Sequence, residues 1–212
     1  MSQQTVSVSN AQERARASRK DAGAARRTQL IDAAADCFDE FGYAGVTVEM
    51  IAGRAHTSRP TFYAYFRSKD EIFLALVERV TEDLSRTQSL VGLEDASTRQ
   101  ILAATTRAYV DAITSMGGLV ALIDVSATID PAVAAIWNAG VDRRNAGYAR
   151  YLRNLPDGAI EPTLDPERLV QIIGFAIHHG AKRAAGADDA HKEQFILDII
   201  AVTERLIGVQ GG

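Results

Sequence analysis

The stretch TVEMIAGRAHTSRPTFYAYF, residues 47–66, contains two short helix-forming segments with a tight connection between them. Its apolar side chains form two groups that can pack together, namely Val48, Ile51 and Ala52 in the first segment and Phe62 and Phe66 in the second. The connection at residues 55–57 is as short as the turn of a helix-turn-helix. We therefore predict a helix-turn-helix motif at about 47–66.

The residues at the start of each segment favour helix initiation. Thr47 can cap the first helix, and Glu49 lies near the positive end of that helix. Ser58 can cap the second helix, with Pro60 in a first turn where no intrahelical donor is needed. These signals place the start of each helix within a residue or two.

The second helix is expected to expose polar side chains, namely Arg59, Thr61, Tyr63 and Tyr65. A guanidinium fork, a hydroxyl beside a methyl group and phenolic hydroxyls suit the phosphate oxygens and base edges of DNA. The alternative is a surface helix whose tyrosines only lie on neighbouring side chains. The pattern favours DNA binding over that alternative.

Helix signals recur along the rest of the chain, and strand signals are scarce. Capping-box patterns begin helices near Ser68 and Ser97, and Asp-Pro pairs begin two more at Pro131 and Pro166. Two consecutive glycines, at 117–118, break the helix that Ser97 begins. We predict an all-α fold of about nine helices.

The composition bounds the class of protein. A chain of 212 residues can form one or two domains with a real core. Cys37 is the only cysteine, so no intrachain disulfide can form, which fits a reducing compartment. The N-terminus lacks the apolar core of a secretory signal, and the best apolar run, AITSMGGLVALI, stops at Asp124. We expect a cytoplasmic protein.

Positive charge is concentrated near the N-terminus although the net charge is −4. Residues 14–27 hold six Lys or Arg against one Asp, whereas residues 91–212 hold eleven against fifteen acidic residues. We expect a flexible basic arm over residues 1–22. A solvated tail without a partner is the alternative reading of such a run.

No pattern in the sequence indicates catalysis, a cofactor or a metal. The motifs G-x-S-x-G, H-E-x-x-H and the phosphate-binding loop are missing. His178 and His179 are adjacent, so they point about 100° apart on a helix and cannot easily share a metal. We interpret Asp124 as a surface charge and Asp130 as a helix cap, rather than as an acid/base pair.

Residues from about 25 to 76 resemble the N-terminal domain of the tetracycline-repressor (TetR) family of bacterial transcription regulators. The resemblance rests on four motifs, FDEFG at 38–42, TVEMIA at 47–52, TFYAYF at 61–66 and SKDEI at 68–72. The SRPTFYAYF version is most similar to the branch with the mycobacterial regulator of ethionamide activation. His56 and Thr57 depart from the pattern, which commonly has glycine and an aliphatic residue there.

The resemblance implies roles on double-stranded operator DNA for the helix-turn-helix. Thr61 and Tyr63 are expected to touch the phosphate backbone or bases in the major groove, with Arg59 and Tyr65 as further candidates. Pro60 is expected against a thymine methyl group. The remaining expected contacts go to phosphates from Thr47 and Lys69, and the basic arm is expected in the minor groove.

The resemblance also implies a division into an arm over 1–22, a DNA-binding domain over 23–70 and a ligand-binding and dimerisation domain over 71–212. The last two helices, near 166–185 and 189–208, are expected to form the homodimer interface. The effector pocket is expected among the fourth to eighth helices. Its candidate lining residues, which plain core packing would explain equally well, are Tyr109, Met116, Trp137, Tyr148, Phe175 and His179.

The leading hypothesis is a homodimeric transcriptional repressor that a small, largely apolar ligand releases from its operator. The alternative is a small-molecule carrier or interaction module whose helix-turn-helix does not read DNA. An all-helical enzyme is a third class, which the missing catalytic pattern disfavours. No cofactor and no membrane contact are expected.

Overall fold

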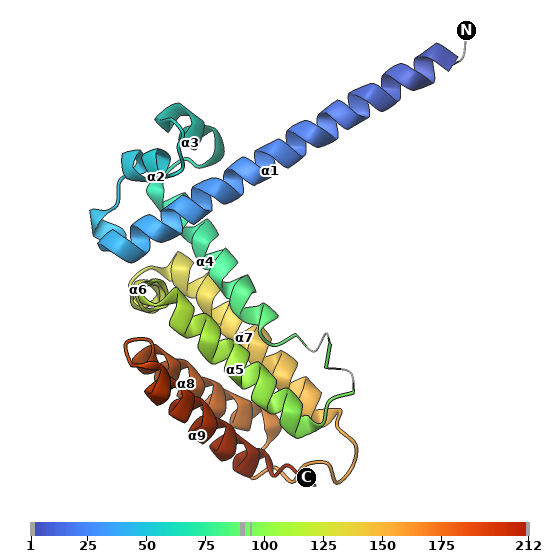
Figure 1. Cartoon of the computed structure of the whole chain (residues 1–212), viewed down its shortest axis with the longest axis vertical. Coiled ribbons are helices and arrows are strands. Elements are labelled where there is room, and N and C mark those ends of the chain that lie inside the picture. Colours follow the sequence, from blue (N-terminus) through green and yellow to red (C-terminus); the bar gives the residue numbers. More distant parts are fainter. Residues whose placement is uncertain (1–2, 90–91, 94, 211–212) are drawn as a thin grey trace. The chain divides into compact units, whose positions relative to one another are not determined.

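The computed structural model describes residues 3–89, 92–93 and 95–210, with side chains from residue 21 onward (Figure 1). Within these ranges the chain forms nine α-helices and no strand, which confirms the predicted all-α class. The helices are α1 (Gln3–Gly45), α2 (Val48–Arg54), α3 (Arg59–Tyr65), α4 (Lys69–Arg86), α5 (Thr98–Met116), α6 (Gly118–Ala127), α7 (Pro131–Arg153), α8 (Pro166–Ala184) and α9 (Asp189–Ile207).

The chain divides into two compact units, residues 1–76 and 77–212, and the division falls inside α4. The boundary expected from the sequence, at 70/71, lies near the start of the same helix. Because α1 begins at Gln3, residues 3–22 are part of a helix where we expect a flexible arm. The expected minor-groove role of this segment stays a prediction.

The N-terminal unit is built around aromatic and aliphatic side chains from its four helical segments. Ile51 of α2 and Phe62 of α3 are fully buried, and Phe66 just after α3 is buried with them. Phe38 of α1 and Phe73 of α4 pack edge to face with ring centroids 5.0 Å apart. This core fixes which side of α3 faces outward.

The C-terminal unit packs α5 against α8 and α9, and α7 against α6 and α8. One part of its core joins Leu102 of α5, Leu152 of α7, Leu169 of α8 and Ile207 of α9. α8 and α9 approach closely, because a side chain on Gly180 would collide with the Phe195 ring, 2.3 Å from a Cβ placed there. These helices leave a cavity between them.

Most predicted helix starts are confirmed at the level of hydrogen bonds. Asp130 and Asp165 cap α7 and α8, and Ser97 forms a complete capping box with Gln100 at α5. The box predicted at Ser68 is only half formed. The Ser68 hydroxyl accepts from the Glu71 N–H at 3.1 Å, but the Glu71 carboxylate accepts from the N–H of Arg67.

Among the described residues, no single helix is long and apolar enough to cross a membrane. α5 and α6 together satisfy the same test of length and composition, but the chain bends by 89° between them.

Candidate DNA-contacting helix and ligand cavity

The second helix of the predicted motif is held by the caps that the sequence indicates. The Ser58 hydroxyl accepts from the Thr61 N–H at 3.3 Å, and Pro60 lies in the first turn of α3. At α2, the Thr47 hydroxyl accepts from the Met50 N–H at 3.3 Å. Thr47 itself is exposed, so its hydroxyl lies at the surface beside the first free N–H groups of the helix.

One face of α3 is exposed along its whole length. This outer face comprises the exposed residues Arg59, Pro60, Tyr63 and Ala64 of α3 and the exposed Arg67, which lies just beyond the end of the helix. Tyr63 is 48% exposed, although its ring meets the edge of Phe62. The face therefore combines two guanidinium groups, a phenol and small apolar groups.

Arg59 is already partnered within the chain. Its guanidinium lies 2.5 Å from the Glu49 carboxylate of α2. The neighbouring Tyr63 hydroxyl and then Glu49 raise the pKa of Arg59. Because both members of the ion pair are more than half exposed, water screens their attraction, and a phosphate can compete for Arg59.

Thr61 and Tyr65 lie together on one flank of α3 rather than on its outer face, and both are half-buried. The Thr61 hydroxyl is 3.0 Å from the Ser58 hydroxyl. The Tyr65 hydroxyl lies beside α1, where a methyl group placed on Gly23 would be 3.9 Å away. The four polar residues expected on one exposed side are thus split between an outer face and one flank.

Lys69 anchors the turn between α1 and α2. Its ammonium donates to the carbonyl oxygens of Tyr43 at 2.8 Å and Val46 at 3.1 Å, and lies 4.4 Å from the centre of the Tyr43 ring. An ammonium group has three donors, so one remains for a phosphate. The structure therefore adds a structural role to the expected phosphate contact.

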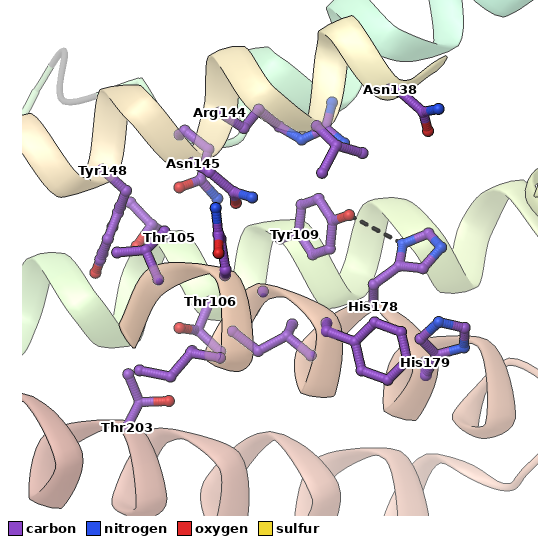
Figure 2. Close-up of a pocket in the computed structure, with 18 of the residues that line it drawn as sticks. Thr105, Thr106, Tyr109, Asn138, Arg144, Asn145, Tyr148, His178, His179 and Thr203 are labelled. Atoms are coloured by element: carbon purple, nitrogen blue, oxygen red, sulfur yellow. Dashed lines mark hydrogen bonds between the residues drawn. The ribbon is translucent and has the colours of Figure 1, made fainter. Parts of the chain in front are cut away.

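The C-terminal unit contains a cavity of about 340 Å³ between α5, α7 and α8 (Figure 2). Its apolar wall includes Trp137, Val141, Val170, Ile173 and Ile177. Its polar wall includes Thr106, Tyr109, Arg144, Asn145 and His178. A cavity of this size with an apolar body and convergent polar groups is typical of a site for a small molecule.

Asp124 is the centre of a hydrogen-bond network in the cavity wall. Its carboxylate accepts from the Trp137 indole at 2.9 Å, from His178 at 3.0 Å and from the Lys182 ammonium. Burial alone would raise the pKa of Asp124, but the hydrogen bonds from His178 and Lys182 outweigh it and lower the pKa to about 2. The interpretation of Asp124 as a surface charge is therefore wrong.

The network continues from His178 to Tyr109. Because a carboxylate only accepts, His178 must carry a hydrogen on Nε2. Its Nδ1 lies 3.0 Å from the Tyr109 hydroxyl, as the dashed line in Figure 2 marks. Burial raises the pKa of Tyr109, so this hydroxyl keeps its proton at neutral pH.

Arg144 of α7 lies over the rings of Tyr109 and Trp137, 5.9 and 6.0 Å from their centres. Its Nη1 atom is completely buried and has no hydrogen-bond acceptor among the described residues. Burial lowers the pKa of Arg144, and Tyr109 partly offsets this effect. A buried cation of this kind is unusual without a counter-ion.

A family model of known proteins matches the N-terminal unit. Residues 30–76 match the family model described as bacterial regulatory proteins, tetR family. These residues include α2, α3 and their connection. Over this segment the chain is similar to the TetR family of bacterial regulators.

Two relatives with assigned names match over part of the chain. The chain is 40% identical over 70 residues to the HTH-type transcriptional repressor Rv1474c of Mycobacterium tuberculosis, a match that covers 33% of this chain and 37% of the relative. It is 35% identical over 88 residues to the HTH-type transcriptional activator FasR of Mycolicibacterium smegmatis, covering 42% and 40%. The matched segments thus span less than half the length of these relatives.

The fold extends the likeness beyond the N-terminal unit. A crystal structure of a TetR-family transcriptional regulator from Mesorhizobium loti aligns with a TM-score of 0.72, covering 88% of this chain and 98% of the other. At 21% identity, this likeness shows the fold and not the ligand.

The cavity brings together five of the six candidate lining residues. These are Tyr109, Trp137, Tyr148, Phe175 and His179. Met116 is the last residue of α5 and does not line the cavity. Whether any of the five binds an effector stays a prediction.

Sequence reasoning missed the polar half of the cavity. Arg144, Asn145 and Thr106 were not singled out, and His178 was considered only as a metal ligand. Nothing local distinguishes Arg144 from its exposed neighbour Arg143. Just beyond the end of α3, exposure adds Arg67 to the candidates.

Proposed function

We propose that this chain is a homodimeric transcriptional repressor whose outer face of α3 enters the major groove of operator DNA and which a small ligand releases. The observation that carries the proposal is the orientation of α3. Phe62 and Phe66 are buried, while Arg59, Pro60, Tyr63 and Arg67 lie outside. A helix with this division presents hydrogen-bond donors and an apolar contact to base edges and phosphates.

The proposed homodimer is supported by an uncovered apolar face on the last two helices. The exposed fractions of Ile172 and Phe175 on α8 are 53% and 67%, and those of Leu197 and Val202 on α9 are each 50%. Large apolar side chains grouped on neighbouring helices mark an interaction surface. An isologous pair of these faces would bury them and place two recognition helices on one DNA molecule.

The proposed release is supported by the cavity in the C-terminal unit. A ligand can shift the protein from its DNA-bound conformation only if it prefers a different one. The cavity walls come from several helices, so filling the cavity can change how these helices pack. The proposal requires that the ligand favour an arrangement in which the two recognition helices no longer fit successive major grooves.

The test of DNA reading uses two substitutions with opposite expected effects. Tyr63→Phe removes only a hydroxyl, and we expect operator affinity to fall by about 1 kcal/mol with stability unchanged. Glu49→Gln releases Arg59 and removes a negative charge beside the DNA, so affinity should rise. Tyr151→Phe, a half-buried tyrosine of the C-terminal unit, is the matched control.

The measurement is a binding titration against operator and scrambled DNA at several salt concentrations. A salt-dependent complex that Tyr63→Phe weakens and Glu49→Gln strengthens supports the proposal. Wild-type affinity in both variants would remove α3 as the reading helix and favour the carrier alternative.

A further inference from the structure

The cavity contains one positive charge without a counter-ion. Among the residues that line it, only Asp124 and Arg144 carry permanent charges of opposite sign. The Asp124 carboxylate already accepts hydrogen bonds from Lys182, Trp137 and His178. No carboxylate in the described part of the chain pairs with Arg144. The site therefore has a net positive charge that is left for a ligand.

The surroundings of Arg144 favour an oxyanion over other partners. A guanidinium group presents parallel N–H donors that match a carboxylate in a bidentate pair. Nη1 is sealed against solvent near Gly140, so a ligand must approach the part of the side chain that lines the cavity. The Tyr109 and Trp137 rings both contact the guanidinium group, with their centres 5.9 and 6.0 Å from its carbon.

The rest of the wall defines the body of the ligand. Val141, Val170, Ile173 and Ile177 supply apolar surface, and Asn145 of α7 adds an amide to the same wall (Figure 2). The volume of about 340 Å³ lies at the small end of the range for ligand sites. One unpaired positive charge matches a singly charged carboxylate better than a doubly charged phosphate.

From these observations we propose that the effector is a compact organic carboxylate, whose carboxylate group pairs with Arg144 and whose apolar body fills the space between α5, α7 and α8. This proposal rests on the proposed function of the cavity as an effector site. The sequence predicts a largely apolar ligand, whereas this proposal predicts an anion with an apolar body.

The test compares probes that differ only in charge. We would titrate the protein, without DNA, with 4-phenylbutyrate and 1-naphthoate and with the primary amides of both acids. Trp137 is the only tryptophan and lies in the cavity wall, so its fluorescence reports occupancy directly. Thermal unfolding provides a second readout, because a ligand that binds the folded state raises the melting temperature.

We expect at least one acid to bind about tenfold or more tightly than its amide, as a charge-assisted pair implies. Arg144→Gln should reduce the affinity for that acid to that for the amide. Arg143→Gln, at the exposed neighbouring position, should leave both affinities unchanged. If the Arg144→Gln variant does not fold, the ratio of acid to amide affinity in the wild type still tests whether the cavity binds a carboxylate.

Three outcomes would overturn the proposal. They are equal affinity for the acids and their amides, a preference for the acid that Arg144→Gln does not remove, and no binding of either acid at millimolar concentration. Such a failure leaves the DNA-binding proposal intact, since no DNA is present. Acid binding by a protein that does not bind DNA would instead retain the carboxylate site and overturn the proposed repressor function.

Discussion

The turn between α2 and α3 depends on one residue with an unusual backbone. His56 has a φ of 48°, a region that L-residues other than asparagine, aspartate and histidine rarely enter. The turn is closed by the Thr57 N–H, which donates to the Ala52 carbonyl at 2.9 Å. Histidine thus keeps the geometry of the helix-turn-helix at a cost in conformational energy.

Replacing His56 by glycine should stabilise the chain. We expect His56→Gly to raise the free energy of unfolding by roughly 1 kcal/mol, because glycine enters positive φ without the clash of a Cβ atom. His56→Ala keeps the Cβ atom and should not stabilise. Denaturant unfolding followed by circular dichroism measures both, and equal effects of glycine and alanine would contradict the backbone explanation.

Residue roles that depend on neighbours in the sequence were predictable, and roles that depend on distant neighbours were not. Ser58 and Pro60 act within one turn of their own helix, so the local pattern identifies them. Tyr65 turns toward Gly23 of α1, and Asp124 meets His178 and Lys182, which lie 54 and 58 residues away. No local pattern contains those contacts.

Close helix packing in the C-terminal unit depends on Gly140 of α7. A Cβ placed there would lie 2.0 Å from Cγ2 of Thr81 on α4. Gly147 of the same helix has open space around the corresponding position. The two glycines therefore have opposite expected responses to the same substitution.

Gly140→Ala should destabilise the chain by about 1 to 3 kcal/mol, because α4 and α7 must move apart. Gly147→Ala should stabilise it by about 0.5 to 1 kcal/mol through helix propensity alone. Thermal unfolding monitored by Trp137 fluorescence compares them. Stabilisation by both alanines would show that the helices separate without cost.

The network around Asp124 should make stability depend on pH. The pKa of this carboxyl is lowered to about 2 in the folded chain, compared with 3.8 for an ordinary aspartate. A lowered pKa stabilises the folded state above the ordinary value, and this stabilisation is lost as pH falls through the folded value. We expect a contribution of about 2 kcal/mol at neutral pH that disappears between pH 4 and about 2.

Asp124→Asn isolates this contribution, because asparagine keeps the shape of the side chain and does not titrate. The stability difference between wild type and variant should be largest near pH 6 and shrink toward pH 3. Urea unfolding at both pH values measures it. A difference that is the same at both would mean that Asp124 is not held ionised by His178 and Lys182.

At the scale of the whole molecule, the positions of the helices were easier to predict from the sequence than the faces through which the helices pack. Helix ends and the helix-turn-helix follow from caps, prolines and apolar spacing. The outward direction of Ile172 and Leu197, in contrast, depends on which faces of α8 and α9 the core already uses. The small residue Gly180 of α8 packs against Phe195 of its own chain.

The uncovered face of α8 and α9 leads to a prediction about assembly. We expect the chain to be a dimer at micromolar concentration, because Ile172 and Leu197 are half exposed and would be buried against a second copy. Ile172→Glu and Leu197→Glu should each produce a monomer, since burying an unpaired carboxylate is costly. Ile129→Glu is the matched control, because Ile129 is 78% exposed but lies between α6 and α7.

Sedimentation of the wild type and the three variants tests the dimer, and DNA titration tests its consequence. A monomer presents one recognition helix instead of two, so the α8 and α9 variants should lose most of their operator affinity while their stability changes little. The Ile129→Glu variant should remain dimeric and bind DNA normally. A wild-type monomer at micromolar concentration, or dimers that persist in both interface variants, would place the interface elsewhere, and the exposed side chains of α8 and α9 would then have another partner.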